Sequence, residues 1–206
     1  MTNPIDQSNA GGYASRAGAK LHAALHHFQI DVSHLACADL GCSTGGFTDC
    51  LLQHGASRVY AVDTAYGELA WKLRQDERVT VLERTNALHL DPNNDPRKAL
   101  TEFPGVNFVC IDLGWTKQAK AFPAAIRWLK HDNDHPNGTI ITLIKPHYET
   151  GEHHLEDHHA EQISTEVAES LTQPHITLLG LIPSPIRGGK GKNLEFLAAY
   201  RLKTPA

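Results

Sequence analysis

The chain has 206 residues, of which 41% are hydrophobic, a length that supports one covered core but not two ordinary enzyme domains. Nineteen basic against 23 acidic residues give a net charge of −4, which argues against nucleic-acid binding through global positive charge, so any RNA contact must be local. The sequence contains neither a secretory signal nor a long apolar run, so we expect a cytoplasmic protein without a membrane span.

Short apolar runs alternate with amphipathic stretches along most of the chain. The runs predict strands at residues 35–40, 58–62, 79–82, 106–111 and 139–144. Between them, three segments carry apolar side chains at three- and four-residue steps and predict helices, namely residues 47–54, 67–75 and 122–130. This alternation indicates crossover units and a parallel sheet with helices on both faces.

The last part of the chain has a different pattern. A polar region, residues 146–159, precedes a predicted helix at about residues 161–171. Apolar runs at residues 175–182 and 194–202 predict an antiparallel strand pair that closes the sheet. We therefore predict an α/β, Rossmann-like domain over residues 13–206, with a mostly parallel seven-stranded sheet and an antiparallel last strand. Residues 1–12 are predicted to form a flexible arm.

Each of the first four predicted strands ends in a polar residue or is followed by one within a few positions. They are Asp39, Asp63, Asn86 and Asp112, separated by 24, 23 and 26 residues. Acidic residues at such positions also cap helices, but four in register favour a nucleotide site at the carboxyl ends of the strands.

A glycine-rich loop lies between the first predicted strand and the next helix. It reads DLGCSTGGFT over residues 39–48, with the second glycine four positions after the first. This spacing differs from the G-x-G-x-x-G fingerprint and suits the methionine part of S-adenosylmethionine better than a pyrophosphate. Asp63 is placed to accept hydrogen bonds from a ribose, and Asn86 to address either an adenine edge or a neighbouring loop.

Several motifs occur in a fixed order along the chain. They are YASRAGAKL (residues 13–21), the loop at residues 41–48, LAWKLR (69–74), ERTNA (83–87), IKP (144–146) and NLEFL (193–197). In this order they resemble the TlyA-type branch of the FtsJ-like RNA 2′-O-methyltransferases, over residues 13–202.

The resemblance implies S-adenosyl-L-methionine as cofactor, ribosomal RNA or a ribosomal subunit as partner, and a Lys-Asp-Lys-Glu tetrad. The matching tetrad positions are Lys20, Asp112, Lys145 and Glu195. Loop and resemblance together predict cofactor contacts at Gly41, Ser43, Thr44, Gly45, Phe47, Asp63, Asn86 and Asp112.

Two features depart from the family pattern. Only 12 residues precede Tyr13, where TlyA-type proteins carry a small RNA-binding domain, so we expect substrate recruitment to differ. After Asp112 the chain reads Leu113-Gly114-Trp115 where the pattern has a Ser-Phe segment, so the target RNA is left open.

The tetrad residues suit methyl transfer to a ribose hydroxyl, because positioning and removal of the hydroxyl proton supply much of the rate. We expect burial and the second cation, Lys20, to lower the pKa of Lys145 so that it acts as general base. Asp112 would orient Lys145, Lys20 would hold ribose or phosphate, and Glu195 would bond one of the lysines. Taken singly, each residue is also compatible with a solvated strand end or an ordinary ion pair.

Several other side chains could have either a functional or a structural role. A helix could bring His154 and His158 to one face at metal-ligand spacing, but they lie in a polar region and methyl transfer requires no metal, so we predict no metal site. The four cysteines include no Cys-x-x-Cys pair, so we predict reduced thiols. Arg187, Lys190 and Lys192 lie among glycines and predict a loop that contacts RNA phosphates, although an exposed hairpin explains them too. Trp115 is placed either to stack a base or to pack in the core, and His147 and Tyr148 either to contact substrate or to pack on the sheet.

Two other functions stay open from the sequence. One is a non-catalytic RNA- or ribosome-binding protein on a methyltransferase fold, which loss of the tetrad would have favoured. The other is a small-molecule methyltransferase, which normally needs an additional cap over its substrate pocket.

Overall fold

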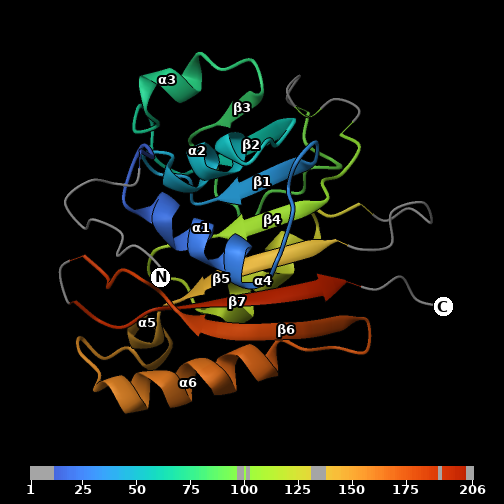
Figure 1. Cartoon of the computed structure of the whole chain (residues 1–206). Helices are drawn as coiled ribbons and strands as arrows, with labels where there is room; N and C mark the ends of the chain where they lie inside the picture. Colours follow the sequence, from blue (N-terminus) through green and yellow to red (C-terminus); the bar gives the residue numbers. More distant parts are fainter. Residues whose placement is uncertain (1–11, 97–99, 101–102, 131–137, 190–191, 203–206) are drawn as a thin grey trace.

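The computed structural model describes residues 12–96, 100, 103–130, 138–189 and 192–202. All but the last residue of the predicted N-terminal arm therefore lies outside the described residues. A seven-stranded sheet in the order β3-β2-β1-β4-β5-β7-β6 forms the middle layer (Figure 1). The strands are β1 (Ala36–Leu40), β2 (Arg58–Val62), β3 (Val79–Leu82), β4 (Phe108–Ile111), β5 (Thr139–Ile144), β6 (Ile176–Pro183) and β7 (Phe196–Leu202).

The first five strands run parallel, and β7 runs antiparallel to both β5 and β6. The predicted Rossmann-like sheet with its antiparallel closing pair is thus confirmed. The strand order reverses beside β1, where Leu40 pairs with Val62 on one side and with Ile111 on the other. Because these three residues share one level of the sheet, the residues that follow them meet at its carboxyl edge.

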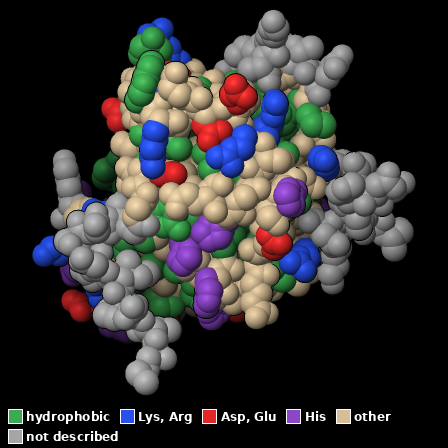
Figure 2. Space-filling view, turned by 45° about the horizontal axis from the view of Figure 1, so that its top comes forward, with side chains coloured by type: hydrophobic (Ala, Val, Ile, Leu, Met, Phe, Trp, Pro, Cys, Tyr) green, Lys and Arg blue, Asp and Glu red, His purple; other side chains and the backbone are tan. Residues whose placement is uncertain are grey.

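Helices cover both faces of the sheet (Figure 1). They are α1 (Ala17–His27), α2 (Gly46–Gln53), α3 (Trp71–Arg74), α4 (Gln118–Ile126), α5 (Pro146–Thr150) and α6 (Asp157–Ser170). On the first face, α1, α2 and α3 bury Leu21, Phe47 and Leu73 in one apolar cluster. Figure 2 shows histidine side chains gathered on the outside of this layer, where the rings of His22 and His54 lie 5.2 Å apart.

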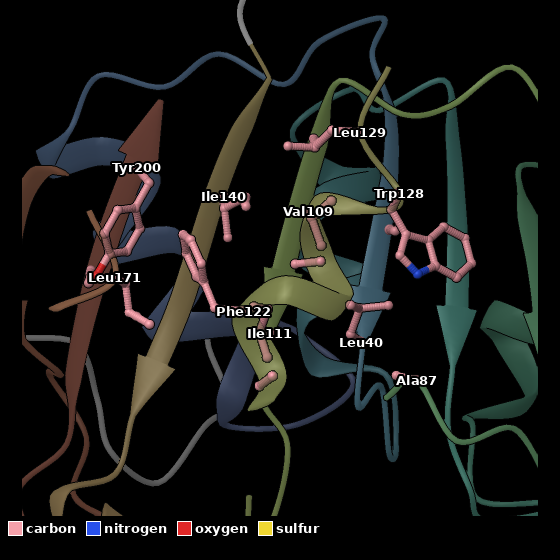
Figure 3. Close-up of a cluster of buried hydrophobic side chains, with 14 of the residues drawn as sticks. Leu40, Ala87, Val109, Ile111, Phe122, Trp128, Leu129, Ile140, Leu171 and Tyr200 are labelled. Carbon is pink, nitrogen blue, oxygen red and sulfur yellow. The ribbon is translucent and has the colours of Figure 1, made fainter. Parts of the chain in front are cut away.

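The second face is covered by α4 and α6, which pack on a separate apolar cluster. Figure 3 shows Phe122 of α4 against Tyr200 of β7, and their ring centroids lie 4.6 Å apart in a T-shaped contact. Each fully buried aromatic ring removes a large apolar area from water and stabilises the fold by about 2 kcal/mol or more. No described helix is long and apolar enough to cross a membrane.

All four predicted helices have different bounds in the structure, although α2 is shifted by only one residue, and α1 was recognised only as a motif. Of residues 67–75, only α3 is helical, because Gly67 takes a φ of +79° and the preceding chain is held in a loop. The helix expected at residues 122–130 begins four residues earlier, where the Gln118 amide donates to the buried backbone oxygen of Leu143 at 3.1 Å. The helix expected from residue 161 begins at Asp157.

Candidate active site

A tight loop joins β1 to α2. Gly41 and Gly45 take φ angles of +95° and +96°, in the left-handed region that favours glycine. A Cβ on Gly41 would lie 2.5 Å from the Asp112 carbonyl oxygen, and a Cβ on Gly45 would lie 2.2 Å from the Leu73 side chain. The loop backbone therefore approaches the neighbouring strand end and α3 more closely than any side chain would allow.

Asp63, directly after β2, holds this loop. Its Oδ2 accepts a hydrogen bond from the Ser43 backbone N–H at 2.8 Å, and its Oδ1 accepts one from the Ala65 backbone N–H at 2.8 Å. A carboxylate oxygen accepts more than one hydrogen bond, so the side chain keeps capacity for hydroxyl groups of a ligand. Its role as the acceptor for a ribose stays a prediction.

A cavity of about 440 Å³ opens at the carboxyl ends of these strands. Five of the predicted cofactor residues line it, namely Gly41, Ser43, Asp63, Asn86 and Asp112. The Asn86 Oδ1 accepts a hydrogen bond from the Leu88 backbone N–H at 2.9 Å, which fixes the orientation of the amide. Carboxylate, amide and backbone groups together form a donor and acceptor set that fits a nucleoside.

The other three predicted cofactor residues lie in the same loop but outside the cavity lining. Thr44 accepts a hydrogen bond through its backbone oxygen from the Ala70 N–H at 3.2 Å. Gly45 is buried against α3, and Phe47 is only 2% exposed within the apolar cluster of the first face. These three residues do not line the cavity, so their contribution to a cofactor would be through the loop conformation.

Asp39 also lies beneath the cavity. Its side chain is fully buried, and its Oδ2 accepts a hydrogen bond from the Thr48 hydroxyl at 2.7 Å. Burial raises the pKa of this carboxyl to about 7. Its Oδ1 has no hydrogen-bond partner within the part of the chain that the structure describes. Asp39 therefore connects the end of β1 to α2, whereas the three other polar strand-end residues face the cavity.

The four tetrad positions form two ion pairs. Lys145, directly after β5, donates to the Asp112 Oδ1 at 2.5 Å, and Lys20 of α1 donates to the Glu195 Oε2 at 2.5 Å. Both pairs are largely withdrawn from solvent, because the four side chains are 4% to 19% exposed. The structure thus brings together residues that are up to 175 positions apart in the sequence.

The expected depression of the Lys145 pKa is not found. Burial alone would lower this pKa, but the charge and hydrogen bond of Asp112, together with the charge of Glu195, raise it above the usual value of lysine. The sequence-based expectation overlooked how closely the carboxylate contacts the ammonium group. Lys145 is therefore protonated at neutral pH in this state of the protein.

A second cavity, of about 660 Å³, borders Glu195 and the start of α5. Trp115 lines both cavities and is 83% exposed, so its position in the core is ruled out. Its ring stacks on Tyr148 with centroids 4.7 Å apart, and the Lys145 ammonium lies 5.5 Å from the Tyr148 ring centroid. The Lys145 and Asp112 pair therefore lies beside both cavities, because Asp112 lines the first and Tyr148, which Lys145 contacts, lines the second.

His147 lines the same second cavity. Its Nδ1 atom is buried and makes no hydrogen bond within the described residues. Burial lowers the pKa of this imidazole, and the nearby Lys145 lowers it further against the opposing charge of Glu195. The lowered pKa favours the neutral imidazole, and its Nδ1 atom is covered by protein atoms rather than exposed to the cavity.

The basic segment before β7 lines a third cavity, of about 450 Å³. Arg187 pairs with Asp157 at 2.6 Å, Lys192 is exposed, and Lys190 lies outside the described residues. Arg16, from the segment before α1, lines the same cavity. The motif at residues 13–21 thus contributes a basic residue that the sequence reasoning did not connect with this loop.

Asn193 was also missed, although it is 3% exposed and connects two loops. Its amide donates to the His153 backbone oxygen at 3.0 Å, and its Oδ1 accepts from the Leu155 backbone N–H at 3.3 Å. A lone asparagine gives no sequence signal for such a long-range contact.

Within the described residues, no group of three or more potential ligand side chains is arranged to hold a metal ion.

Solved structures place this architecture among the Rossmann-like methyltransferases. The N-methyltransferase NodS of Bradyrhizobium japonicum, in complex with S-adenosyl-l-homocysteine, superposes with a TM-score of 0.57 at 13% identity, covering 92% of this chain and 87% of NodS. A structure from Streptococcus thermophilus, whose protein bears the name hemolysin, gives a TM-score of 0.82 at 34% identity, covering 95% of this chain and 68% of that one. The chain thus has the fold of the Rossmann-like methyltransferases.

The chain belongs to the FtsJ-like methyltransferase family, which matches residues 13–201, and specifically to its TlyA-type branch. YqxC of Bacillus subtilis is 39% identical over 193 residues, covering 90% of this chain and 64% of YqxC. The 16S/23S rRNA (cytidine-2′-O)-methyltransferase TlyA of Mycobacterium tuberculosis is 36% identical over 199 residues, covering 93% of this chain and 69% of TlyA. The chain thus spans about two thirds of the length of these relatives.

Proposed function

We propose that this protein transfers the methyl group of S-adenosylmethionine to a ribose 2′-hydroxyl of ribosomal RNA. The observation that carries the proposal is the part-buried Lys145 and Asp112 pair, in which Asp112 lines the first cavity and Lys145 contacts the ring of Tyr148, which lines the second. One cavity has the polar set that suits a nucleoside cofactor, and the other is open and lined by aromatic rings. The TlyA relative and the overlap with a structure solved with S-adenosyl-l-homocysteine support this assignment.

The residues of the first cavity fit the cofactor. Asp63 keeps acceptor capacity for ribose hydroxyls, the Asn86 amide presents polar atoms to a base edge, and the glycine turn at Gly41 lets the backbone approach closely. S-adenosylmethionine, when bound, supplies a methyl group on a positively charged sulfur. The chain itself must then position the acceptor oxygen and remove its proton.

Lys145 takes that proton in our proposal. Only a neutral amine accepts a proton, and Asp112 raises the pKa of Lys145, so the neutral fraction is small at neutral pH. Asp112 holds the lysine side chain in place through the 2.5 Å hydrogen bond. Lys20, held by Glu195, supplies a second positive charge for a phosphate or ribose oxygen of the substrate.

The test is methyl transfer from labelled S-adenosylmethionine to ribosomal subunits and to free ribosomal RNA. After nuclease digestion, mass spectrometry identifies whether the methyl group lies on a ribose or a base. We expect ribose methylation that Lys145→Ala abolishes and that Lys120→Ala, which removes an exposed lysine of α4, leaves unchanged. RNA binding without methyl transfer in the unmodified protein would instead establish a non-catalytic RNA-binding protein.

A further inference from the structure

The described residues expose four large hydrophobic side chains, and three of them are aromatic. Trp115 follows β4, while Tyr66 and Trp71 follow β2 and are 69% and 73% exposed. All three therefore come after the carboxyl ends of strands, at the edge of the sheet that carries both cavities. Leu179 of β6, the fourth, is 39% exposed. Single exposed apolar side chains are common, but a cluster of them on one surface is typical of a site that binds a partner.

Arg84 joins this group from the loop after β3. Its guanidinium carbon lies 4.3 Å from the centroid of the Tyr66 ring, a cation–π contact. The backbone fixes the pair, because the Arg84 N–H donates to the Ala65 oxygen at 3.2 Å and the Gly67 N–H donates to the Glu83 Oε1 at 2.7 Å. A flat ring and a planar cation are thus held in one exposed stack.

Trp71 is presented by the neighbouring helix. Leu73 of α3 is buried against the cofactor loop at Gly45, and the Ala70 N–H donates to the Thr44 oxygen at 3.2 Å. With α3 anchored on this side, Trp71 extends into solvent. Figure 2 shows hydrophobic side chains beside basic ones at its upper left edge, over α3. Tyr66, Trp71 and Arg84 are called the aromatic platform below.

We propose that the aromatic platform binds unpaired bases of the RNA substrate, at a distance from the acceptor ribose. The inference rests on the proposed function. Bases of any sequence stack on aromatic rings and on the guanidinium plane, so this set of side chains fits single-stranded RNA. The net charge of −4 leaves stacking, together with local cations such as Arg84, as the means of holding RNA here.

The sheet sets the distance between the platform and the reacting groups. Three strand spacings separate β2 from β5, and four separate β3 from β5, which corresponds to roughly 14 to 19 Å. A stacked strand advances about 3.4 Å per nucleotide, so the platform contacts bases about four to six nucleotides from the acceptor. One continuous single strand can therefore occupy both sites.

The test measures binding of a fluorescein-labelled, mixed-sequence, single-stranded RNA of twelve nucleotides by fluorescence anisotropy at fixed salt. A matched oligomer with the same ribose-phosphate backbone but no bases reports phosphate contacts alone. We expect Tyr66→Ala and Trp71→Ala each to weaken binding of the normal oligomer about tenfold, as loss of one stacked base does. The two variants should bind the abasic oligomer as well as the unmodified protein does. Leu179→Ala, the control, should leave binding of both oligomers unchanged.

Three outcomes overturn the platform. They are unchanged affinity for the normal oligomer, equal loss with the abasic oligomer, and weaker cofactor binding by calorimetry. The proposed function fails separately. If the variants lose affinity for the normal oligomer alone but the unmodified protein methylates no RNA, the platform stands and the enzymatic assignment falls.

Discussion

Removing the Glu195 carboxylate should destabilise the folded protein, because Lys20 would keep a charge with no partner. The side chains of Lys20 and Glu195 are 11% and 4% exposed, and their hydrogen bond measures 2.5 Å. Breaking a buried ion pair by removing one partner costs about 3 to 5 kcal/mol. Because Lys20 keeps some solvent contact, we expect Glu195→Leu to cost about 3 kcal/mol of unfolding free energy.

The measurement is equilibrium urea unfolding, supported by calorimetry. For a domain of this size, about 3 kcal/mol corresponds to a melting temperature lower by roughly 6 to 12 °C. Glu195→Gln, whose amide oxygen still accepts a hydrogen bond from Lys20, should lose less.

A double variant separates the buried charge from the loss of packing. Lys20→Met with Glu195→Leu replaces the pair by apolar side chains of similar size, so stability should return to near the original value. Methyl transfer should be lost in this double variant, because the proposed substrate contact of Lys20 is gone. A Glu195→Leu protein within about 0.5 kcal/mol of the original, with no gain from the second change, would show that the pair behaves as a surface salt bridge.

Three further predictions concern turnover and binding. Turnover should rise with pH above neutrality, about tenfold per pH unit, at every pH below the raised pKa of Lys145. Lys145→Arg should be nearly as inactive as Lys145→Ala, because arginine stays protonated. Single-turnover methylation measured across pH checks both expectations, and a flat pH profile contradicts the assignment of Lys145 as the base. Asp63→Ala should weaken binding of S-adenosylhomocysteine by about 2 kcal/mol, roughly thirtyfold, in calorimetry, and unchanged affinity would remove Asp63 from the cofactor site. Replacing Arg16, Arg187 and Lys192 by alanine should weaken RNA binding and flatten its salt dependence while cofactor affinity is kept, and an unaltered salt slope would mark an ordinary exposed hairpin.

Periodicity and loop chemistry were enough to predict the architecture. Parallel strands of similar length, each followed by a crossover, bring their carboxyl ends to one edge, so Asp63, Asn86 and Asp112 could be expected beside the glycine loop. Helix bounds were less accurate where tertiary contacts decided them. Gln118 begins α4 because its amide is satisfied by a buried strand, which no local pattern reveals.

The sequence by itself thus determined the sheet and the glycine loop, and its motifs predicted four tetrad positions. Only the tertiary structure decided how these residues pair, because the contact between Lys20 and Glu195 joins α1 to the start of β7 across 175 positions. It also decided the sign of the Lys145 pKa shift, since burial and the Asp112 carboxylate act in opposite directions and only their distance determines which dominates. Exposure is likewise a property of the folded chain, which is why Trp115 could be placed at the site only from its surroundings.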